Sequence, residues 1–248
     1  AEMTNLGIPV PPGFTISTAV CQYYMEKGVY PENLERQVQS SLSQIEKIMG
    51  QIFGNAENPL LVSIRSGARL SMPGMMETIL NVGLTSKTIP GLIEKSSDER
   101  FVYDAYRRLI TMYADVVMEK AANIEPAEGE GIREKLDEIM VSLKKRDGAK
   151  IDGDLSAQSL KELCEMYKSI IHKTFKCEFP DDPYSQLWGG ITAVFKSWNG
   201  KRAESYRNIE NIPHHWGTAV NIQSMIFGNM GADCATGVAF TRNPATGE

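Results

Sequence analysis

Apolar residues recur at two different spacings along this chain, and the spacing divides it into helices and strands. Residues 34–52 repeat an apolar position every three or four residues, at Leu34, Val38, Leu42, Ile45, Met49 and Ile52. That spacing predicts an amphipathic helix, which Gly54 would end. Residues 59–65 are almost uninterruptedly apolar and include β-branched side chains, which is typical of a short strand buried on both faces.

Residues 66–84 begin with small side chains and a Met-Pro-Gly-Met-Met run, and then return to apolar residues at helical spacing. The pattern predicts a strand-to-helix turn with Arg65 at the end of the strand. Ahead of these elements, residues 6–14 hold three prolines and two glycines. Proline fixes φ and disfavours helix in the residue before it, so this stretch is expected to be an extended connector.

The middle of the chain is mostly helical in pattern. Helices are expected over residues 98–121, within residues 129–150, and from Ser156 to about residue 175, with Ser156 as an N-cap. These segments predict a helical insertion over residues 85–177. Beyond it, residues 182–212 predict a helix broken near Asn199 and Gly200 and then a second helix.

The last part of the chain returns to strand patterns. Residues 218–228 alternate between apolar and polar side chains, and residues 236–242 form a second short apolar run. A loop of small and turn-forming residues separates them. The two segments therefore predict a β-hairpin.

Composition limits the classes of protein that fit. The 248 residues are 42% hydrophobic and 23% charged, with a net charge of −5 and no long basic tract. This balance is typical of a globular domain and disfavours nucleic acid or an anionic membrane as a partner. No apolar run reaches the length of a membrane span, and the N-terminus lacks a secretion-signal pattern. The four cysteines and three histidines show no metal-binding spacing, so no metal site is expected in this segment.

Two segments carry candidate chemistry for binding phosphate. Arg65, at a strand end beside a Gly-Ala-Ser turn, is either a surface residue paired with a carboxylate or a phosphate-binding guanidinium. The methionines after it are either core filler or a cover over a flat apolar ligand. The loop with Thr236 and Gly237 is either a plain hairpin turn or a second phosphate-facing loop. The chain has no P-loop, dinucleotide fingerprint or GxSxG elbow.

Four stretches together resemble the pyruvate, phosphate dikinase family. They read AEMTNLGIPVPPGFTIST, SIRSGARLSMPGMMETILNVGL, YDAYRRLITMYADVVM and GTAVNIQSMIFGNM with TGVAFTRNPATGE, in the family's order. The resemblance implies an α/β (α+β) fold that is ATP-grasp-like, with a large helical insertion, and incomplete at both ends. The implied divisions are a first subdomain from residues 1–84 and 178–216, an insertion from 85–177, and the start of a second subdomain at 217–248.

The family's reaction is what the resemblance implies for the parent protein. ATP phosphorylates a histidine on a separate swivelling domain, which then carries the phosphate to pyruvate. The products are phosphoenolpyruvate, AMP and pyrophosphate, and inorganic phosphate is consumed. The implied cofactors are ATP and Mg²⁺, and the implied partners are ATP or AMP and the phosphohistidine domain. The parent is expected to be a homodimer, the fragment a monomer, and the location cytoplasmic with an organelle as an alternative.

The resemblance also assigns roles to residues. Arg65 is the implied catalytic residue, because a positioned guanidinium stabilises charge on phosphoryl oxygens. The residues implied to cover the nucleotide are Met72, Pro73, Gly74, Met75 and Thr78. Those implied to run beside adenine are Gln223, Met225 and Ile226. Those implied to lie over the triphosphate are Ala235, Thr236 and Gly237.

This sequence departs from the family pattern at two positions. The last loop has Ala235 where the family has glycine, which would weaken nucleotide binding if that position needs a positive φ. Glu77 replaces the family's aspartate.

The family's phosphate-binding lysine is expected before Ala1 and its metal ligands after Glu248. We therefore expect the 248 residues alone to be inactive. The alternatives are a fragment of a phosphoenolpyruvate synthase-like enzyme and a non-catalytic interaction module that keeps the fold.

Overall fold

The computed structural model describes residues 2–70, 72 and 74–248. A four-stranded sheet lies at its centre, in the order β1 (Gly13–Ile16), β6 (Ala219–Ser224), β4 (Val62–Gly67) and β5 (Thr78–Val82). Each strand is antiparallel to its neighbours. Two short parallel strands, β2 (Ile52–Phe53) and β3 (Pro59–Leu60), form a second sheet. The mixed α/β class expected from the sequence is confirmed.

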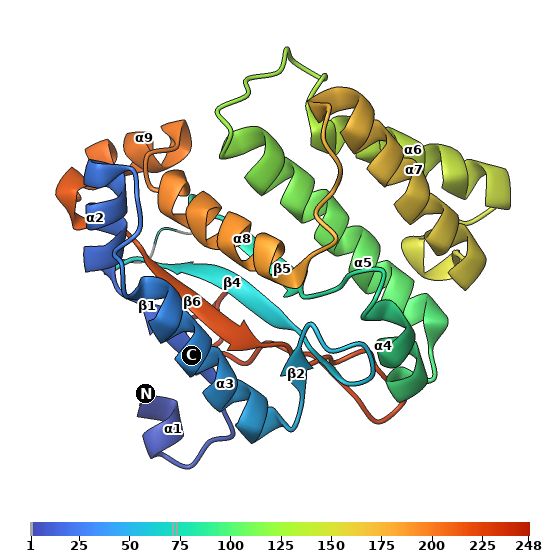
Figure 1. Ribbon diagram of the computed structural model, residues 1–248, viewed down its shortest axis with the longest axis horizontal. Coiled ribbons are helices and arrows are strands. Elements are labelled where there is room, and N and C mark those ends of the chain that lie inside the picture. The colour runs from blue at the N-terminus through green and yellow to red at the C-terminus, as the bar shows by residue number, and fades with distance from the viewer. Residues whose placement is uncertain (1, 71, 73) are drawn as a thin grey trace.

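Helices account for most of the remaining chain. Short turns of helix are α1 (Glu2–Asn5) and the 3₁₀ segments Asp152–Asp154 and His214–Trp216. The longer helices are α2 (Thr18–Lys27), α3 (Leu34–Met49), α4 (Ile89–Ser96), α5 (Glu99–Tyr113), α6 (Ile132–Asp147), α7 (Ala157–Phe175), α8 (Pro183–Ser197) and α9 (Lys201–Ile209). A π-helix, Ala114–Lys120, continues α5. Figure 1 shows α3 and α8 lying over the sheet and α6 and α7 lying together beyond α5.

The helix-covered face of the sheet is apolar. Ile64 on β4 is paired with Ile222 on β6 and with Ile79 on β5, and all three side chains are fully buried. Helix α8 packs on this row at Gly190, where a Cβ would lie 2.5 Å from Ile64 Cδ1. Burying an aliphatic side chain of this size contributes about 1.5–3 kcal/mol, so the row is a main source of the contact between α8 and the sheet.

Side chains in the helical region belong to the same core as the sheet. Buried residues of α5, α6 and α7 form one continuous apolar cluster with those of β4 and β5. Ser156 caps α7 as expected, since its side chain accepts a hydrogen bond from the backbone N–H of Ser159. The division of the chain into subdomains stays a prediction.

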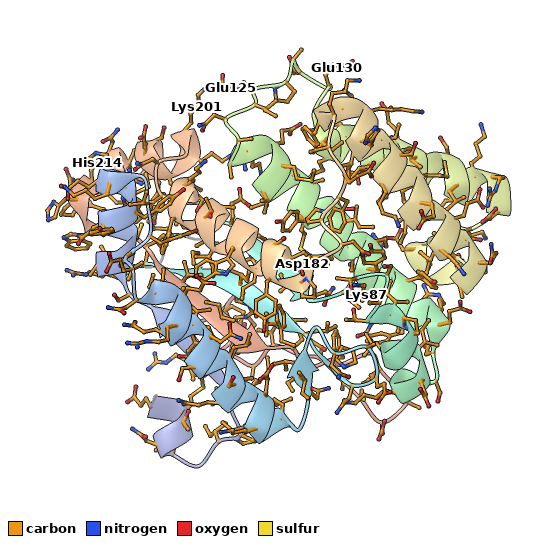
Figure 2. All side chains as sticks on the ribbon, viewed as in Figure 1. Lys87, Glu125, Glu130, Asp182, Lys201 and His214 are labelled. Atoms are coloured by element: carbon orange, nitrogen blue, oxygen red, sulfur yellow. The ribbon has the colours of Figure 1, made fainter. Side chains whose placement is uncertain are left out.

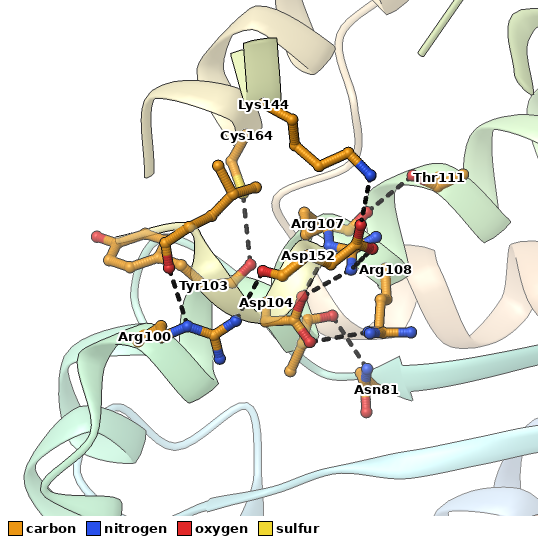
Figure 3. A network of polar contacts seen from close by, with 12 residues as sticks. Asn81, Arg100, Tyr103, Asp104, Arg107, Arg108, Thr111, Lys144, Asp152 and Cys164 are labelled. Carbon is orange, nitrogen blue, oxygen red and sulfur yellow. Dashed lines mark hydrogen bonds and ion pairs between the residues drawn. The ribbon is translucent and has the colours of Figure 1, made fainter. Parts of the chain in front are cut away.

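A polar network joins α5 to the α6–α7 pair (Figure 3). Arg107 of α5 lies 2.7 Å from Asp104 on the same helix and 2.9 Å from Asp152, which follows α6. Lys144 of α6 lies 2.9 Å from the other oxygen of Asp152. Arg100 donates to the backbone carbonyls of Asp152 and Leu155. These contacts fix the turn between α6 and α7 against α5.

Three sequence-based predictions about elements need correction, one in where the element ends and two in its type. The helix expected over residues 34–52 ends at Met49, because Gly50 takes the left-handed conformation there and Ile52 enters β2. The segment expected to be a helix after the methionines is strand β5. Its Ile79 and Val82 pair with β4, so tertiary pairing overrides the apolar spacing.

The expected C-terminal hairpin is also absent from the part of the chain that the structure describes. Residues 236–242 form no strand. Strand β6 has β1 on one edge and β4 on the other, so it has no free edge for a second strand to pair with. The expected strand at residues 218–228 is confirmed in its first half, as β6. The break between α8 and α9 near Gly200 is confirmed.

None of the helices among the described residues is both long and apolar enough to cross a membrane.

Candidate functional site

The face of the sheet opposite the helices carries polar side chains. Successive residues of a strand point to opposite faces, and paired residues of antiparallel strands point to the same face. Arg65 on β4 is paired with Asn221 on β6 and with Thr78 on β5, and Asn221 is paired with Thr15 on β1. These four residues form one row across the sheet. We call it the polar row, and its members are Thr78, Arg65, Asn221 and Thr15.

The polar row is open to solvent. Arg65, Thr15 and Thr78 are exposed, and Asn221 is half-buried. Among the residues that the structure describes, Arg65 takes part in no ion pair or side-chain hydrogen bond. Thr15 Oγ1 donates to Asn221 Oδ1 over 2.7 Å. A guanidinium, an amide and two hydroxyls therefore face the same space, a set of groups suited to phosphate oxygens.

The neighbouring row is partly covered by the proline-rich connector. Gln223 is paired with Ser63 and with Gly13, and its Nε2 donates to the carbonyl of Pro11 over 3.0 Å. A Cβ at Gly13 would lie 2.6 Å from the carbonyl oxygen of Ile222, so only glycine allows the connector to approach β6 this closely. The side-chain nitrogen of Gln223 is thus hydrogen-bonded to the connector.

The end of β6 leaves few backbone groups free to contact a base. The N–H of Ser224 donates to Pro12, and the N–H of Met225 donates to Leu61, each over 2.9 Å. Within the described ranges, no hydrogen bond to the backbone of Ile226 is found, and its side chain is 61% exposed. If this segment contacts adenine through its backbone, Ile226 is the residue best able to do so.

Met72, the first methionine in the loop between β4 and β5, is not part of the polar row. Met72 is buried in a small apolar cluster with Trp198, Ala203 and Ile212. Met75 packs partly against the same cluster. Pro73, also predicted to cover the nucleotide, lies outside the described residues. Of the residues predicted to cover a nucleotide, Thr78 alone among those described belongs to the polar row, and the covering role stays a prediction.

A cavity of about 370 Å³ lies beside the methionine loop. Gly74 and Met75 line it, together with the end of the π-helix and the start of α9. Four basic side chains contribute to its wall: Lys120, Lys196, Lys201 and Arg202. Three of them have partners. Lys120 lies 3.1 Å from both Glu77 and Asp115, Lys196 donates to the carbonyl of Ala121, and Lys201 pairs with Glu125 (Figure 2).

The C-terminal loop with Thr236 and Gly237 packs against Gly228, where a Cβ would overlap Thr236 Oγ1 and the carbonyl of Ala235. No hydrogen bond joins this loop to Arg65 among residues 2–70, 72 and 74–248. Ala235 is not among the residues with a positive φ. The alanine at this position therefore creates no backbone strain in this conformation, and its effect on nucleotide binding stays a prediction.

Two other kinds of chemistry receive no support. Burial raises the pKa of the Cys164 thiol to about 12 and also raises the pKa of Cys21, so neither is a ready thiolate nucleophile at neutral pH. In the described part of the chain, no group of three or more His, Cys, Asp or Glu side chains is arranged to hold a metal ion. The Mg²⁺ that the family resemblance implies stays a prediction.

The sequence identified Arg65, Thr78 and Gln223 but missed Asn221 and Thr15. The signal was present for Asn221, since an alternating strand at residues 218–228 places Asn221 on the same face as Gln223. That Asn221 lies opposite Arg65 depends on pairing between segments about 155 residues apart, which the alternation does not reveal.

The fold and this face define a class: a mixed α/β nucleotide-binding domain, in which helices back one side of an antiparallel sheet. A family model described as "Pyruvate phosphate dikinase, AMP/ATP-binding domain" matches residues 28–248. The chain belongs to this family.

Individual relatives agree with the family match. The chain is 50% identical to pyruvate, phosphate dikinase of Rhizobium meliloti (strain 1021), 46% to that of Clostridium symbiosum, and 49% to pyruvate, phosphate dikinase 1, chloroplastic, of Arabidopsis thaliana. Each alignment covers 100% of this chain but only 26%, 27% and 25% of the respective relative. The chain thus spans about a quarter of the length of these relatives.

Proposed function

We propose that the polar row binds the phosphates of ATP and that this chain forms part of the ATP site of a pyruvate, phosphate dikinase. The observation that carries the proposal is the position of Arg65. Its guanidinium stands exposed on a sheet face whose other side is fixed by α8, so the charge is held by a rigid element. Domains related to this one are named for binding AMP and ATP.

Arg65 would act by stabilising charge during phosphoryl transfer. The transferred group spreads negative charge over its oxygens in the transition state, and a positioned guanidinium lowers the energy of that state. Arginine suits this role because its planar fork donates two parallel hydrogen bonds to one phosphate. The acceptor in the whole protein is proposed to be a histidine of another domain, which would pass the phosphate to pyruvate.

Other parts of the site are proposed to come from segments outside these 248 residues. The resemblance assigns a lysine and the Mg²⁺-binding carboxylates to such segments, and we propose that the isolated chain has no dikinase activity. The proposed whole protein is a cytoplasmic homodimer. Two relatives are chloroplastic by name, so an organelle is the alternative location.

Calorimetric titration with Mg·ATP tests this function. Two proteins are compared: the 248-residue chain, and a version lengthened at both ends to match the ATP-binding domain of its relatives. We expect the lengthened protein to bind ATP clearly more tightly than the short one. Arg65→Ala in the lengthened protein should weaken binding by about tenfold or more, as expected for loss of a charge-assisted contact.

Arg65→Lys is the matched variant, because it keeps the charge and loses the fork. It should bind with an affinity between those of the parent and the alanine variant. A folded lengthened protein that does not bind ATP, or one that binds equally well without Arg65, would contradict the proposal and favour a non-catalytic interaction module.

A further inference from the structure

Asn221 lies beside Arg65 in the polar row, and its amide is held in one orientation. Thr15 Oγ1 donates to Asn221 Oδ1 over 2.7 Å, which directs the amide oxygen toward β1. The amide nitrogen, Nδ2, therefore points the other way, toward β4. Since Arg65 is the residue paired with Asn221 on β4, the amide hydrogens and the guanidinium are neighbours on the open face.

Gly67 provides the space that the amide nitrogen occupies. A Cβ at Gly67 would lie 2.7 Å from Asn221 Nδ2, closer than two such atoms approach without displacement. Gly67 does not have a positive φ, so backbone conformation alone does not require glycine at this position. The absent side chain instead leaves room for the Asn221 amide to lie over β4.

The amide nitrogen still has hydrogen atoms to donate. Its one hydrogen bond among the described residues goes to the carbonyl of Ser66 at 3.5 Å, which is at the limit of such a bond. An amide NH₂ group has two donors, so at least one remains for a ligand. The oxygen, by contrast, already accepts from Thr15. This arrangement presents a donor, and not an acceptor, beside the Arg65 guanidinium.

We propose that Asn221 donates a hydrogen bond to the same phosphate group that Arg65 binds, and that Thr15 acts as a positioning residue by fixing the orientation of the amide. The inference rests on the proposed function, since it adds a second donor to the proposed phosphate site. Asn221 on β6 is paired with Arg65 on β4, and Thr15 holds its amide. One phosphate group can therefore accept hydrogen bonds from both strands.

Asn221→Asp separates this role from a structural one. The carboxylate keeps an oxygen that accepts from Thr15, so the link between β1 and β6 is preserved. It removes the donor and places a negative charge where the phosphate would bind. Gln37→Glu is the matched control, because it makes the same change in net charge at an exposed position on α3, on the opposite side of the sheet.

The probe is inorganic triphosphate, titrated calorimetrically at low salt into the lengthened protein described above, which contains Arg65, Asn221 and Thr15 together with the segments proposed to complete the site. We expect Asn221→Asp to weaken binding by about tenfold or more, and Gln37→Glu to change it by less than about twofold. Thr15→Val should weaken binding several-fold, and Thr15→Ser, which keeps the hydroxyl, should restore it. Circular dichroism melting of each variant shows whether the fold is retained.

The outcomes separate the two proposals. If Arg65→Ala abolishes triphosphate binding while a folded Asn221→Asp binds within twofold of the parent chain, the role of Asn221 is wrong and the proposed phosphate site stands. If Asn221→Asp fails to fold, equal binding by Thr15→Val and Thr15→Ser contradicts the inference. If the lengthened protein and its Arg65→Ala variant bind triphosphate equally, or neither binds, the phosphate site fails and the inference fails with it.

Discussion

On the open face, the role of each residue depends on the residue paired with it on the neighbouring strand. Arg65 is exposed because its neighbours in the sequence, Ile64 and Ser66, point toward the helices, and strand alternation forces it to the other side. Asn221 shares that side because the register of β4 and β6 pairs it with Arg65. The function of either side chain thus depends on one register, and a shift of β6 by one residue would turn Asn221 to the opposite face, away from Arg65.

Gly67→Ala tests the residue-scale account. The added Cβ would displace the Asn221 amide nitrogen, which is the far end of a side chain and can move at small cost. We expect binding of inorganic triphosphate to fall several-fold while the free energy of unfolding changes by less than about 1 kcal/mol, as is usual for surface positions. Calorimetry and urea unfolding measure the two quantities. Unchanged binding in a folded variant would show that triphosphate binding does not depend on a fixed position of the Asn221 amide.

At the scale of elements, α8 holds the sheet in position behind the site. The helix approaches β4 and β5 at Gly190, where a side chain has no room because Ile64 and Ile79 fill the space. This contact fixes the rows of the sheet from the side opposite Arg65.

Gly190→Ala should therefore destabilise the fold. Its Cβ would lie 2.5 Å from Ile64 Cδ1 and 3.2 Å from Ile79 Cδ1, so the packed side chains must shift. We expect a loss of about 1–3 kcal/mol in the free energy of unfolding, which is typical of overpacking. Gly153→Ala is the control, because its Cβ would meet nothing closer than Ile151 Cδ1 at 3.4 Å. Equal effects of the two changes in urea unfolding would contradict this view of the α8 contact.

The elements that the sequence predicted well are those determined by their own residues. The apolar spacing of α3, α5 and α7 and the N-cap at Ser156 are local signals, and the helices are present. Strand β5 was missed because its five residues are too short to show a period, and its partner strand determines its conformation. The expected strand at residues 236–242 failed for a related reason, since both edges of β6 are already paired.

At the scale of the whole molecule, an electrostatic network ties the α6–α7 pair to α5, which in turn packs against β5. Arg107 lies between Asp104 and Asp152, and Lys144 closes the network from α6 (Figure 3). The hydrogen bond from Lys144, with the charge of Arg107 beside it, holds the pKa of Asp152 below its usual range. Ionised Asp152 therefore stabilises the fold.

The sign of the pH dependence follows from that lowered pKa. An aspartate with a lower pKa in the folded state contributes stability above its unfolded pKa, here 3.8, and loses it as pH falls through the folded value. Asp152→Asn should therefore be less stable than the parent chain at pH 7. The difference should persist to about pH 5 and shrink as the pH falls below the unfolded pKa.

Urea unfolding at several pH values measures the effect, with Glu138→Gln on the exposed surface of α6 as the control. The control should show no comparable loss of stability at pH 7. A difference between Asp152→Asn and the parent chain that stays constant down to pH 3 would mean that ionisation of Asp152 is not what stabilises the turn.

At this scale, the candidate site was only partly predictable. The family resemblance identified Arg65, and alternation in one strand would have added Asn221. The contact of Asn221 with Thr15 joins residues 206 positions apart in the sequence, and it arises only when β1 and β6 pair. The burial of Met72 among Trp198, Ala203 and Ile212, in and around α9, was likewise not visible in the local pattern, which favoured a cover over a ligand.

The most direct test of the central claim is to locate the bound phosphate by nuclear magnetic resonance. The ¹⁵N-labelled lengthened protein is titrated with inorganic triphosphate, and the side-chain N–H signals of Arg65 and Asn221 are followed beside the backbone amides. The polar row predicts that these two signals and the amides of β4 and β6 shift together. Shifts confined to Gly74, Lys120 and Lys201 would show that phosphate binds in the cavity beside the methionine loop, and would contradict the account.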